Sequence, residues 1–319
     1  MEIGETYTAQ SGRKYHVLER IATTDGAKIF TARSLNERGR PIRVVKNFRR
    51  HGGLGEFKLE REREILTYLN QINSGEDYPG VIKLLDYSEE ELSLILEYAR
   101  GGDLDDSIDY RGVGGFDLAK AVTIIKQLSG TLSRMFRNEG IVHRDLKPGN
   151  VLLSESVSRN LRGEEQGGSL EELAQAGGMK LCDFSLALKC DRDTGKYESE
   201  VHERKRPSCF IGTPLYCSPK IIRGERGDER SDVWALGVIA YELLVKGGAF
   251  NRNLPLEKLL GEINNFQFPK KIKRDLCGFE RVMYAMMQKN PEDRITAEEI
   301  HYLASEFERR VLEFSPKTL

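Results

Sequence analysis

The 319-residue sequence predicts an α+β chain in which a strand-rich part, residues 1–100, precedes a mainly helical part, residues 101–319. Two observations predict this division. Short apolar runs and alternations, separated by turn residues, dominate the first part. Longer segments with apolar residues at helical spacing dominate the second. A polar stretch at residues 154–178 interrupts the helical pattern and is interpreted as an insert.

The first part is predicted to form a five-stranded antiparallel sheet with one main helix. Apolar runs bounded by turn residues place the strands at residues 15–21, 28–33, 42–48, 81–87 and 92–98. The helix is predicted at residues 55–69, because Leu59, Ile65, Leu66 and Leu69 fall on one helical face.

The second part is predicted to contain helices at residues 117–138, 231–246, 255–264, 276–289 and 296–314. The insert is expected to be a flexible loop with one or two helical turns. Ser169, followed by Glu172 three residues later, is the capping-box signal for such a turn. The simplest interpretation of the insert is a disordered loop without a function of its own.

Composition excludes several classes of protein. Hydrophobic residues make up 39% of the chain, enough for a packed core, and the formal net charge of −1 gives no basic surface for nucleic acid or anionic membranes. No run approaches the roughly 18 apolar residues of a membrane span. The N-terminus lacks a secretory signal pattern, so a cytoplasmic location is expected unless a targeting segment has been trimmed. The five cysteines show no Cys-x-x-Cys spacing and are predicted to be reduced thiols.

The most informative stretch is His-Arg-Asp-Leu-Lys-Pro-Gly-Asn at residues 143–150. It places a carboxylate (Asp145), a cation (Lys147) and a carboxamide (Asn150) on one short loop after an apolar run. A proton acceptor, a point charge for a phosphate and a hard-oxygen metal ligand are the groups that phosphoryl transfer needs. The stretch resembles the catalytic loop of the eukaryotic protein kinases.

The resemblance implies the bilobal protein-kinase fold, with residues 1–100 as the N-lobe and 101–319 as the C-lobe. It implies that Asp145 is the catalytic base, that Asn150 binds Mg²⁺, and that Lys147, typical of the serine/threonine type, steadies the migrating phosphoryl group. Gly-Thr-Pro-Leu-Tyr at residues 212–216 resembles the substrate-docking loop of serine/threonine kinases, in which Thr213 would bridge Asp145 and Lys147. Asp232 matches the helix aspartate that holds the catalytic loop.

On the nucleotide side, Lys46 ends a run that resembles the Val-Ala-Ile-Lys strand, whose lysine holds the α- and β-phosphates of ATP. Glu62 is its expected partner, because apolar residues follow it at +3, +4 and +7. Asp183, in Asp-Phe-Ser, resembles the Mg²⁺-binding Asp-Phe-Gly, with Ser185 replacing the glycine and disfavouring the flipped form. The remaining nucleotide contacts that the resemblance implies are Ile21, Ile29, Val44, the backbone of Glu97 and Ala99, Asp103 (to the ribose) and Leu152.

At two places predicted to contact the nucleotide, the sequence differs from the family pattern. Ala22, Thr24 and Ala27 occupy the three glycine positions of the nucleotide-covering loop, and Val44 replaces the usual alanine above the adenine. The added side chains impede close approach of the backbone to phosphates and crowd the base. Weak or unusual nucleotide binding is therefore predicted.

A further departure concerns an ion pair. Lys220 stands where the family has a glutamate that pairs with an arginine, matched here by Arg294. Two cations close together in a desolvated place would be costly, so another acid is expected to compensate, with Glu292 and Asp293 as candidates.

The favoured function is a serine/threonine protein kinase that uses ATP and Mg²⁺ and acts on a protein substrate, because every charged residue of the chemistry is present. The alternative, favoured by the departures, is a pseudokinase that serves as a binding or scaffold module. A small-molecule kinase is disfavoured by the Gly-Thr-Pro-x-Tyr segment. Phosphorylation of Ser208 or Thr194, whose phosphate would meet Arg144, is a hypothesis for regulation, although Cys209 occupies the position usually phosphorylated.

Overall fold

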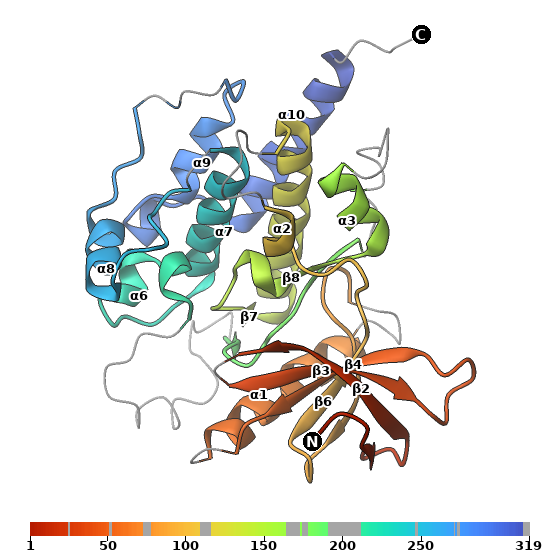
Figure 1. The fold of residues 1–319 in the computed structure, drawn as a ribbon. Helices are drawn as coiled ribbons and strands as arrows, with labels where there is room; N and C mark the ends of the chain where they lie inside the picture. The colour runs from red at the N-terminus through yellow and green to blue at the C-terminus, as the bar shows by residue number, and fades with distance from the viewer. Residues whose placement is uncertain are drawn as a thin grey trace. The chain divides into compact units, whose positions relative to one another are not determined.

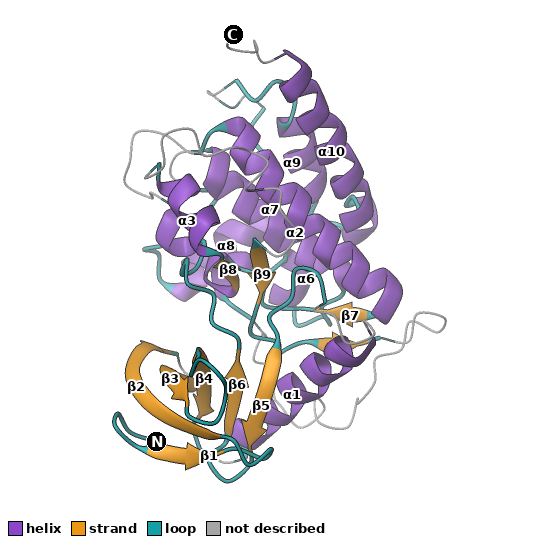
Figure 2. Cartoon of the chain, turned by 90° about the vertical axis from the view of Figure 1, so that its right-hand side faces the viewer, coloured by secondary structure: helices purple, strands orange, loops and turns teal. Residues whose placement is uncertain are grey.

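The structure, a computed structural model, describes residues 1–24, 26–50, 53–72, 78–108, 116–163, 173, 178–190, 212–245, 248–270, 272 and 275–314. Two compact units are present. One consists of Met1–Arg100 with Cys182–Leu186, and the other of Gly101–Leu181 with Ala187–Leu319. The strands of the large sheet belong to the first unit and nearly all helices to the second (Figures 1 and 2).

The first unit contains a six-stranded antiparallel sheet in the order β1-β2-β3-β4-β6-β5 and one helix, α1 (Leu54–Ile72). Its strands are β1 (Thr6–Thr8), β2 (Lys14–Thr23), β3 (Ala27–Ser34), β4 (Ile42–Phe48), β5 (Leu84–Ser88) and β6 (Ser93–Leu96). The antiparallel sheet with one helix confirms the predicted fold class, but the number of strands was wrong. The missed strand, β1, has three residues, too few for a recognisable alternation, and it forms only by pairing along β2.

The pleat of β3 and β4 gives the sheet two chemically different faces. Phe30, Ala32 and Val45 contribute to a buried apolar cluster on one face. The residues between them alternate to the other face. There Ile29 is the cross-strand partner of Lys46, and Thr31 is that of Val44. The face that carries Lys46 therefore also carries two of the residues predicted to contact the nucleotide.

Helix α1 buries one acidic residue in an otherwise apolar stripe. Leu59, Ile65, Leu66 and Leu69 are buried, as is Glu62 between them in the sequence. The spacing of the apolar residues follows the helical period, so it fixes which face of α1 packs against the rest of the first unit. Glu62 shares that face and is therefore carried into the interior.

The second unit is built mainly from seven helices among the described residues: α2 (Leu118–Glu139), α3 (Glu155–Arg162), α6 (Pro219–Ile222), α7 (Glu229–Leu244), α8 (Leu256–Asn265), α9 (Glu280–Met286) and α10 (Ala297–Phe314). Two short antiparallel strand pairs flank the loop at residues 143–150: β7 (Ile141–Val142) with β10 (Leu188–Lys189), and β8 (Val151–Leu153) with β9 (Met179–Leu181). All five predicted helices are present, with bounds shifted by at most a few residues. Helix α7 lies between α2 and α9, and α10 packs along α2 (Figure 1).

The start of the polar insert forms α3, a helix of about two turns, as expected for the insert, although the predicted position was at Ser169. Ser154 caps α3 by accepting a hydrogen bond from Val157 N (3.4 Å), and Val157 and Leu161 are buried four residues apart on one face. Lys120 of α2 donates to the carbonyl oxygen of Asn160 (2.7 Å). Polar residues on the outer face hid this helix in the sequence. The predicted capping box at Ser169 lies outside the described residues.

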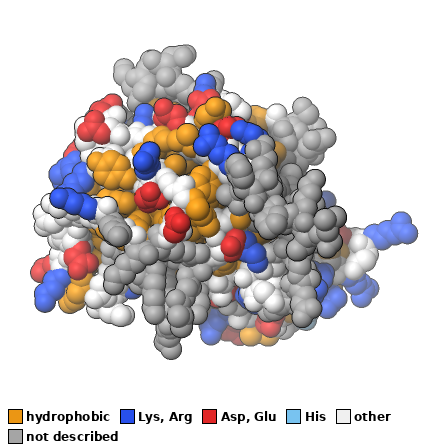
Figure 3. All heavy atoms as spheres, turned by 90° about the horizontal axis from the view of Figure 1, so that it is seen from above, with side chains coloured by type: hydrophobic (Ala, Val, Ile, Leu, Met, Phe, Trp, Pro, Cys, Tyr) orange, Lys and Arg blue, Asp and Glu red, His pale blue; other side chains and the backbone are white. Residues whose placement is uncertain are grey.

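The surface of the second unit carries some apolar side chains. Figure 3 shows hydrophobic side chains gathered among charged ones on the face seen from above. The exposed large hydrophobic residues of the second unit include Leu256, Tyr284, Tyr302 and Leu303. Within the part of the chain that the structure describes, no helix is long and apolar enough to cross a membrane. Among the described residues, Cys182, Cys190, Cys217 and Cys277 form no disulfide bond.

Candidate active site

The backbone of the loop at residues 143–150 is held by a carboxylate of α7. Asp232 Oδ2 accepts a hydrogen bond from His143 N (2.7 Å), and its Oδ1 accepts one from Arg144 N (2.8 Å). Burial raises the pKa of Asp232, while the positive charge near His143 and the two N–H donors oppose that rise. Arg144 adopts a left-handed backbone conformation (φ 69°), which these bonds stabilise. This is the geometry expected of a residue that holds the loop.

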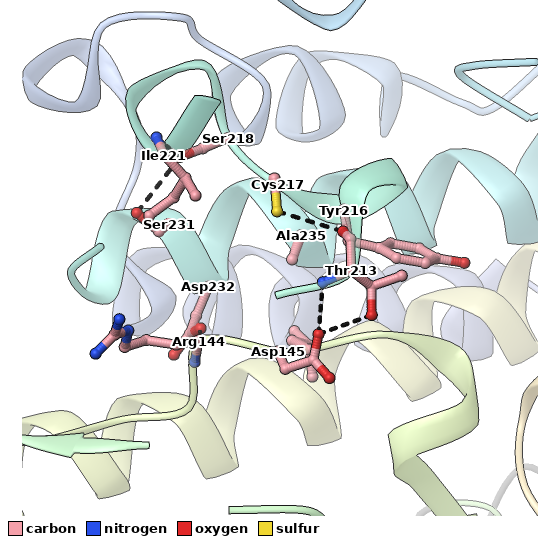
Figure 4. A pocket seen from close by; sticks show the side chains of 11 residues that line it. Arg144, Asp145, Thr213, Tyr216, Cys217, Ser218, Ile221, Ser231, Asp232 and Ala235 are labelled. Carbon is pink, nitrogen blue, oxygen red and sulfur yellow. Dashed lines mark hydrogen bonds between the residues drawn. The ribbon is translucent and has the colours of Figure 1, made fainter. Parts of the chain in front are cut away.

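Asp145 is the centre of a hydrogen-bonded cluster that joins the loop to residue 213. Its Oδ1 accepts from both the backbone N and the hydroxyl of Thr213, each at 2.8 Å (Figure 4). Lys147 Nζ lies 3.2 Å from Asp145 Oδ2 and donates to Thr213 Oγ1 (2.9 Å). Thr213 therefore bridges Asp145 and Lys147, the arrangement that the resemblance implied.

Asn150 completes this cluster. Its Nδ2 donates to the carbonyl oxygen of Asp145 (2.7 Å) and to Asp145 Oδ2 (3.2 Å). Because the amide nitrogen is fixed in this way, Oδ1 is the atom through which Asn150 would bind a metal ion. Carboxamide and carboxylate oxygens are the ligands that Mg²⁺ prefers.

A small pocket lies beside Asp145 and is lined by residues that include Thr213, Tyr216, Cys217 and Ala235 (Figure 4). Cys217 donates its thiol hydrogen to the carbonyl oxygen of Thr213 (3.3 Å). Burial raises the pKa of the Cys217 thiol to about 12, so the thiol stays neutral near pH 7. The docking loop is close to the catalytic loop here, since a Cβ on Gly212 (φ 109°) would lie 2.9 Å from the carbonyl oxygen of Arg144.

In the first unit, Lys46 lies between two carboxylates. Its Nζ is 2.6 Å from Glu62 Oε2 and 2.7 Å from Asp183 Oδ1, and the side chains of Lys46 and Glu62 are 8% and 0% exposed. Burial alone would lower the pKa of Lys46, but the two carboxylates raise it above its ordinary value. Burial, aided by the charge of Asp183, raises the pKa of Glu62 to about 7. Two carboxylates thus share one ammonium group, with the pairing predicted from the sequence.

The Asp-Phe-Ser segment is stabilised by its serine. Ser185 Oγ donates to Asp183 Oδ1 (2.7 Å), the oxygen that also accepts from Lys46. The left-handed backbone conformation falls on Asp183 (φ 63°) rather than on Ser185. Serine therefore causes no backbone strain at the glycine position of the family, and its hydroxyl adds a hydrogen bond.

The residues predicted to contact the adenine divide between the two units. In the first unit, Ile29 and Val44 are half-buried on the Lys46 face, and Ile21 is 47% exposed at a bulge of β2. Glu97 N donates to the carbonyl oxygen of Lys83 (3.1 Å), so an adenine contact from Glu97 would use its own carbonyl oxygen. Ala99 follows β6 and is half-buried.

In the second unit, Leu152 and Asp103 are bridge partners in an isolated antiparallel pair. Leu152 is half-buried in β8. Asp103 Oδ1 accepts from Asp106 N (3.0 Å), so its carboxylate already binds the backbone of the short 3₁₀ turn at Asp105–Ser107. The ribose contact of Asp103 stays a prediction.

The nucleotide-covering loop continues the β2–β3 hairpin to its tip. Thr24 N donates to the carbonyl oxygen of Ala27 (2.8 Å), and Ala27 N donates to Thr24 Oγ1 (3.0 Å). Between them, Gly26 lies against α1, because a Cβ there would be 2.8 Å from Lys58 Nζ. The Ala27 N–H, at one of the three altered glycine positions, is thus engaged within the hairpin.

An acid compensates the charge of Lys220, as expected, but it is neither of the two candidates. Lys220 Nζ pairs with Asp228 Oδ2 (2.5 Å), the residue that also caps α7. Arg294 donates to the carbonyl oxygens of Gln288 (2.9 and 2.6 Å) and Arg230 (2.5 Å), and its guanidinium lies 5.2 Å over the Trp234 ring.

Neither acid that was expected to compensate takes part in these contacts. Asp293 Oδ2 instead accepts a hydrogen bond from Asn290 Nδ2 (3.0 Å). Glu292 contributes its backbone N, which donates to Asn290 Oδ1. The buried Arg294 therefore contacts backbone dipoles and a ring directly, while the charge of Asp228 stabilises its charged form without a direct ion pair.

Sequence reasoning also missed a cluster next to the docking loop, formed by Tyr216, Glu242 and Arg252. No motif points to Arg252, which lies in the connection between α7 and α8. The predicted phosphorylation sites Ser208 and Thr194 lie outside the described residues, as does Cys209.

An antiparallel sheet with a buried lysine–glutamate–aspartate triad, and a helical unit with an aspartate–lysine–asparagine loop, define the catalytic domain of a protein kinase. A family model described as the protein kinase domain matches residues 16–303, and the chain belongs to this family.

Relatives named as serine/threonine kinases agree with this assignment. The chain is 26% identical to serine/threonine-protein kinase ULK1 of Homo sapiens over 247 residues, covering 76% of this chain and 20% of that protein. It is 27% identical over 254 residues to putative serine/threonine-protein kinase R517/R518 of Acanthamoeba polyphaga mimivirus, covering 77% and 52%. With serine/threonine-protein kinase atg1 of Dictyostelium discoideum it shares 28% over 249 residues, covering 76% and 32%. The chain thus spans between about a fifth and a half of the length of these relatives.

Proposed function

We propose that the chain is an active serine/threonine protein kinase that transfers the γ-phosphoryl group of ATP to hydroxyl groups of a protein substrate. The observation that carries the proposal is the cluster in which Thr213 and Lys147 both contact the carboxylate of Asp145. Lys147 and Thr213 at these positions are typical of the serine/threonine type, and the relatives carry that name.

In this mechanism Asp145 orients the acceptor hydroxyl and takes its proton. Its Oδ1 is fixed by two donors from Thr213, which restricts rotation of the carboxylate and aims Oδ2. Lys147, 3.2 Å from that Oδ2, supplies positive charge where negative charge develops on the transferring group. The three residues therefore divide proton acceptance, orientation and charge stabilisation among themselves.

The donor atoms are of the kind that a magnesium ion and a triphosphate require. Asn150 Oδ1 and the Asp183 carboxylate are hard oxygen ligands that would hold Mg²⁺, which would supply positive charge against the phosphates. Lys46, kept in place by Glu62, is the cation for the α- and β-phosphates. The adenine and ribose would contact Ile21, Ile29, Val44, Glu97, Ala99, Asp103 and Leu152.

The test is phosphoryl transfer by the full chain with ATP and Mg²⁺, compared with Asp145→Asn. Loss of the proton acceptor should lower the rate by roughly three orders of magnitude or more. Thermal unfolding should show that the variant is folded, and phosphoamino-acid analysis should show phosphoserine or phosphothreonine. Equal activity in Asp145→Asn, or phosphotyrosine as the main product, contradicts the proposal.

The second candidate is a pseudokinase, and the covering loop is the observation that favours it. The Ala27 N–H donates to Thr24 within the hairpin, so this amide is not directed at a phosphate. A nucleotide that binds without any phosphoryl transfer, in wild type as in Asp145→Asn, would select this candidate.

A further inference from the structure

Two parts of the polar insert are attached to helix α2. At the end of α3, the carbonyl oxygen of Asn160 accepts a hydrogen bond from Lys120 Nζ (2.7 Å). Further along the insert, the carbonyl oxygen of Leu173 accepts one from Gln127 Nε2, and the Leu173 side chain is fully buried. Lys120 and Gln127 are about two helical turns apart, so they lie on one face of α2. These parts of the insert are therefore fixed to the helical core of the second unit.

The start of α3 adjoins the backbone that leads to Asp103. Gly101 N donates to the carbonyl oxygen of Leu153 (3.0 Å), and Leu153 N donates to that of Gly102 (2.9 Å). A Cβ on Gly101 would collide with the carbonyl oxygen of Ser154, the residue that caps α3. The backbone of residue 101 is thus in direct contact with the point where β8 ends and α3 begins.

A second route joins α3 to Asp103. The 3₁₀ turn at Asp105–Ser107 lies against α3, and Asp106 N in this turn donates to Asp103 Oδ1 (3.0 Å). Asp103 is also the bridge partner of Leu152 in β8. The carboxylate of Asp103 is therefore held from the turn and its backbone from β8, and both of these elements adjoin α3.

We propose that Lys120 is a positioning residue for the ribose of the nucleotide and that it acts through α3. By binding Asn160 at the end of the helix, Lys120 keeps α3 against the turn that holds the Asp103 carboxylate. A restrained carboxylate needs less reordering to accept a hydrogen bond from a ribose hydroxyl. The inference rests on the proposed function in one respect, namely that the ribose lies at Asp103. It gives the insert a role in place of the functionless loop expected from the sequence.

The experiment measures how much the ribose hydroxyls contribute to binding. The full chain, with Mg²⁺, is titrated with ATP and with 2′,3′-dideoxy-ATP, and ligand-observed NMR gives the ratio of the two dissociation constants. Wild type should bind ATP roughly tenfold more tightly than the dideoxy nucleotide, because a hydroxyl bound to a carboxylate is lost. Lys120→Met, which removes the donor to Asn160, should lower this ratio to roughly threefold. Lys120→Arg, which retains a donor, should keep the wild-type ratio.

Lys126→Met is the matched control. Lys126 also lies on α2, but its Nζ pairs with the carboxylate of Glu308 on α10 instead of with the insert. This variant should keep the wild-type ratio even where it lowers the melting temperature, so a loss of stability alone does not imitate the effect. Asp103→Ala, which lacks the carboxylate, should bring the ratio to about one. A wild-type ratio in Lys120→Met overturns the proposal, as does a ratio near one in wild type.

A second variant keeps the test decisive if Lys120→Met does not fold. Ser154→Ala removes the cap of α3, which accepts a hydrogen bond from Val157 N, and it should lower the ratio in the same direction. Failure of the proposed function would look different. A wild type that shows the tenfold ratio and transfers no phosphoryl group would remove the kinase activity and leave the role of Lys120 intact. Normal phosphoryl transfer, with the same ratio in Lys120→Met as in wild type, would leave the kinase and overturn this inference.

Discussion

The two charged clusters of the site hold their charges in different ways. In the first unit, Lys46, Glu62 and Asp183 form an ion triad. The side chains of Lys46 and Glu62 are almost completely buried. In the second unit, Asp145 is held mainly by neutral donors, a backbone N–H, a hydroxyl and an amide, and the Lys147 side chain is 30% exposed.

This difference separates stability from catalysis. Breaking a buried ion pair leaves an uncompensated charge in a place without water, so it costs stability as well as function. A carboxylate held by several neutral donors loses one hydrogen bond at a time, and the backbone around it is anchored independently by Asp232. Substitutions in the first cluster should therefore disturb folding and nucleotide binding together, whereas those in the second should disturb catalysis alone.

The largest effect is expected for Lys46→Met. It removes the only cation of the triad and should lower kcat/KM for ATP by roughly a thousandfold, and the free energy of unfolding by about 3 kcal/mol at pH 8. Because the pKa of Glu62 is already raised to about 7, Glu62 can take up a proton as the pH falls, so the loss of stability should be smaller at pH 6.

Lys28→Met is the control for this prediction. Lys28 lies on β3 next to Ile29 and so points to the opposite face from Lys46. Lys28→Met should change kcat/KM for ATP and the free energy of unfolding only slightly. Denaturant unfolding at the two pH values and steady-state kinetics measure the effects. An equal loss of stability at pH 6 and pH 8 would show that Glu62 does not relieve the charge.

The first cluster also shows how far the sequence could predict the site. The Lys46–Glu62 pair followed from apolar residues at +3, +4 and +7, because the helical period fixes which acid is carried inward. The bridge from Thr213 to Asp145 and Lys147 joins two motifs 68 residues apart and was implied by their resemblance to those of the kinases. Each motif is recognisable in a short stretch of chain, but only the resemblance brings the two together.

Contacts that depend on the path of a connection could not be predicted. Lys220 pairs with Asp228 because the chain turns back before α7, and Arg294 finds carbonyl oxygens instead of an acid. Arg252 reaches Glu242 from an irregular segment with no periodic pattern. In each case the partner is chosen by tertiary packing, which short-range patterns do not encode.

A smaller effect is expected for Thr213→Val, which keeps the shape of the side chain and removes the hydroxyl. Asp145 Oδ1 then loses one of its two donors from this residue, and Lys147 loses an acceptor. The value of kcat should fall roughly thirtyfold, whereas the melting temperature should stay nearly constant, because the backbone N–H of residue 213 still binds Asp145. Thr213→Ser, which retains the hydroxyl, should restore most of kcat. A large drop in melting temperature for Thr213→Val would show that substitutions around Asp145 affect stability as well as catalysis.

The smallest effect is expected on the nucleotide side, for Val44→Ala. Val44 lies on the Lys46 face of the sheet, as the cross-strand partner of Leu96 and Thr31, where the family places an alanine above the adenine. We expect wild type to bind ATP with a Kd in the range of roughly 0.1 to 1 mM. Loss of two methyl groups should tighten binding roughly fivefold by relieving crowding.

Titration calorimetry of the purified protein with Mg²⁺ and ATP measures this change. Val45→Ala is the matched control, because Val45 is fully buried on the opposite face, in the apolar cluster with Phe30. It should lower the free energy of unfolding by about 2 kcal/mol and leave Kd unchanged. If Val44→Ala binds ATP no more tightly than wild type, the engaged N–H of Ala27 in the covering loop, rather than the residue above the base, limits the affinity. Low-micromolar binding by wild type would rule out both explanations, since neither departure would then weaken the site.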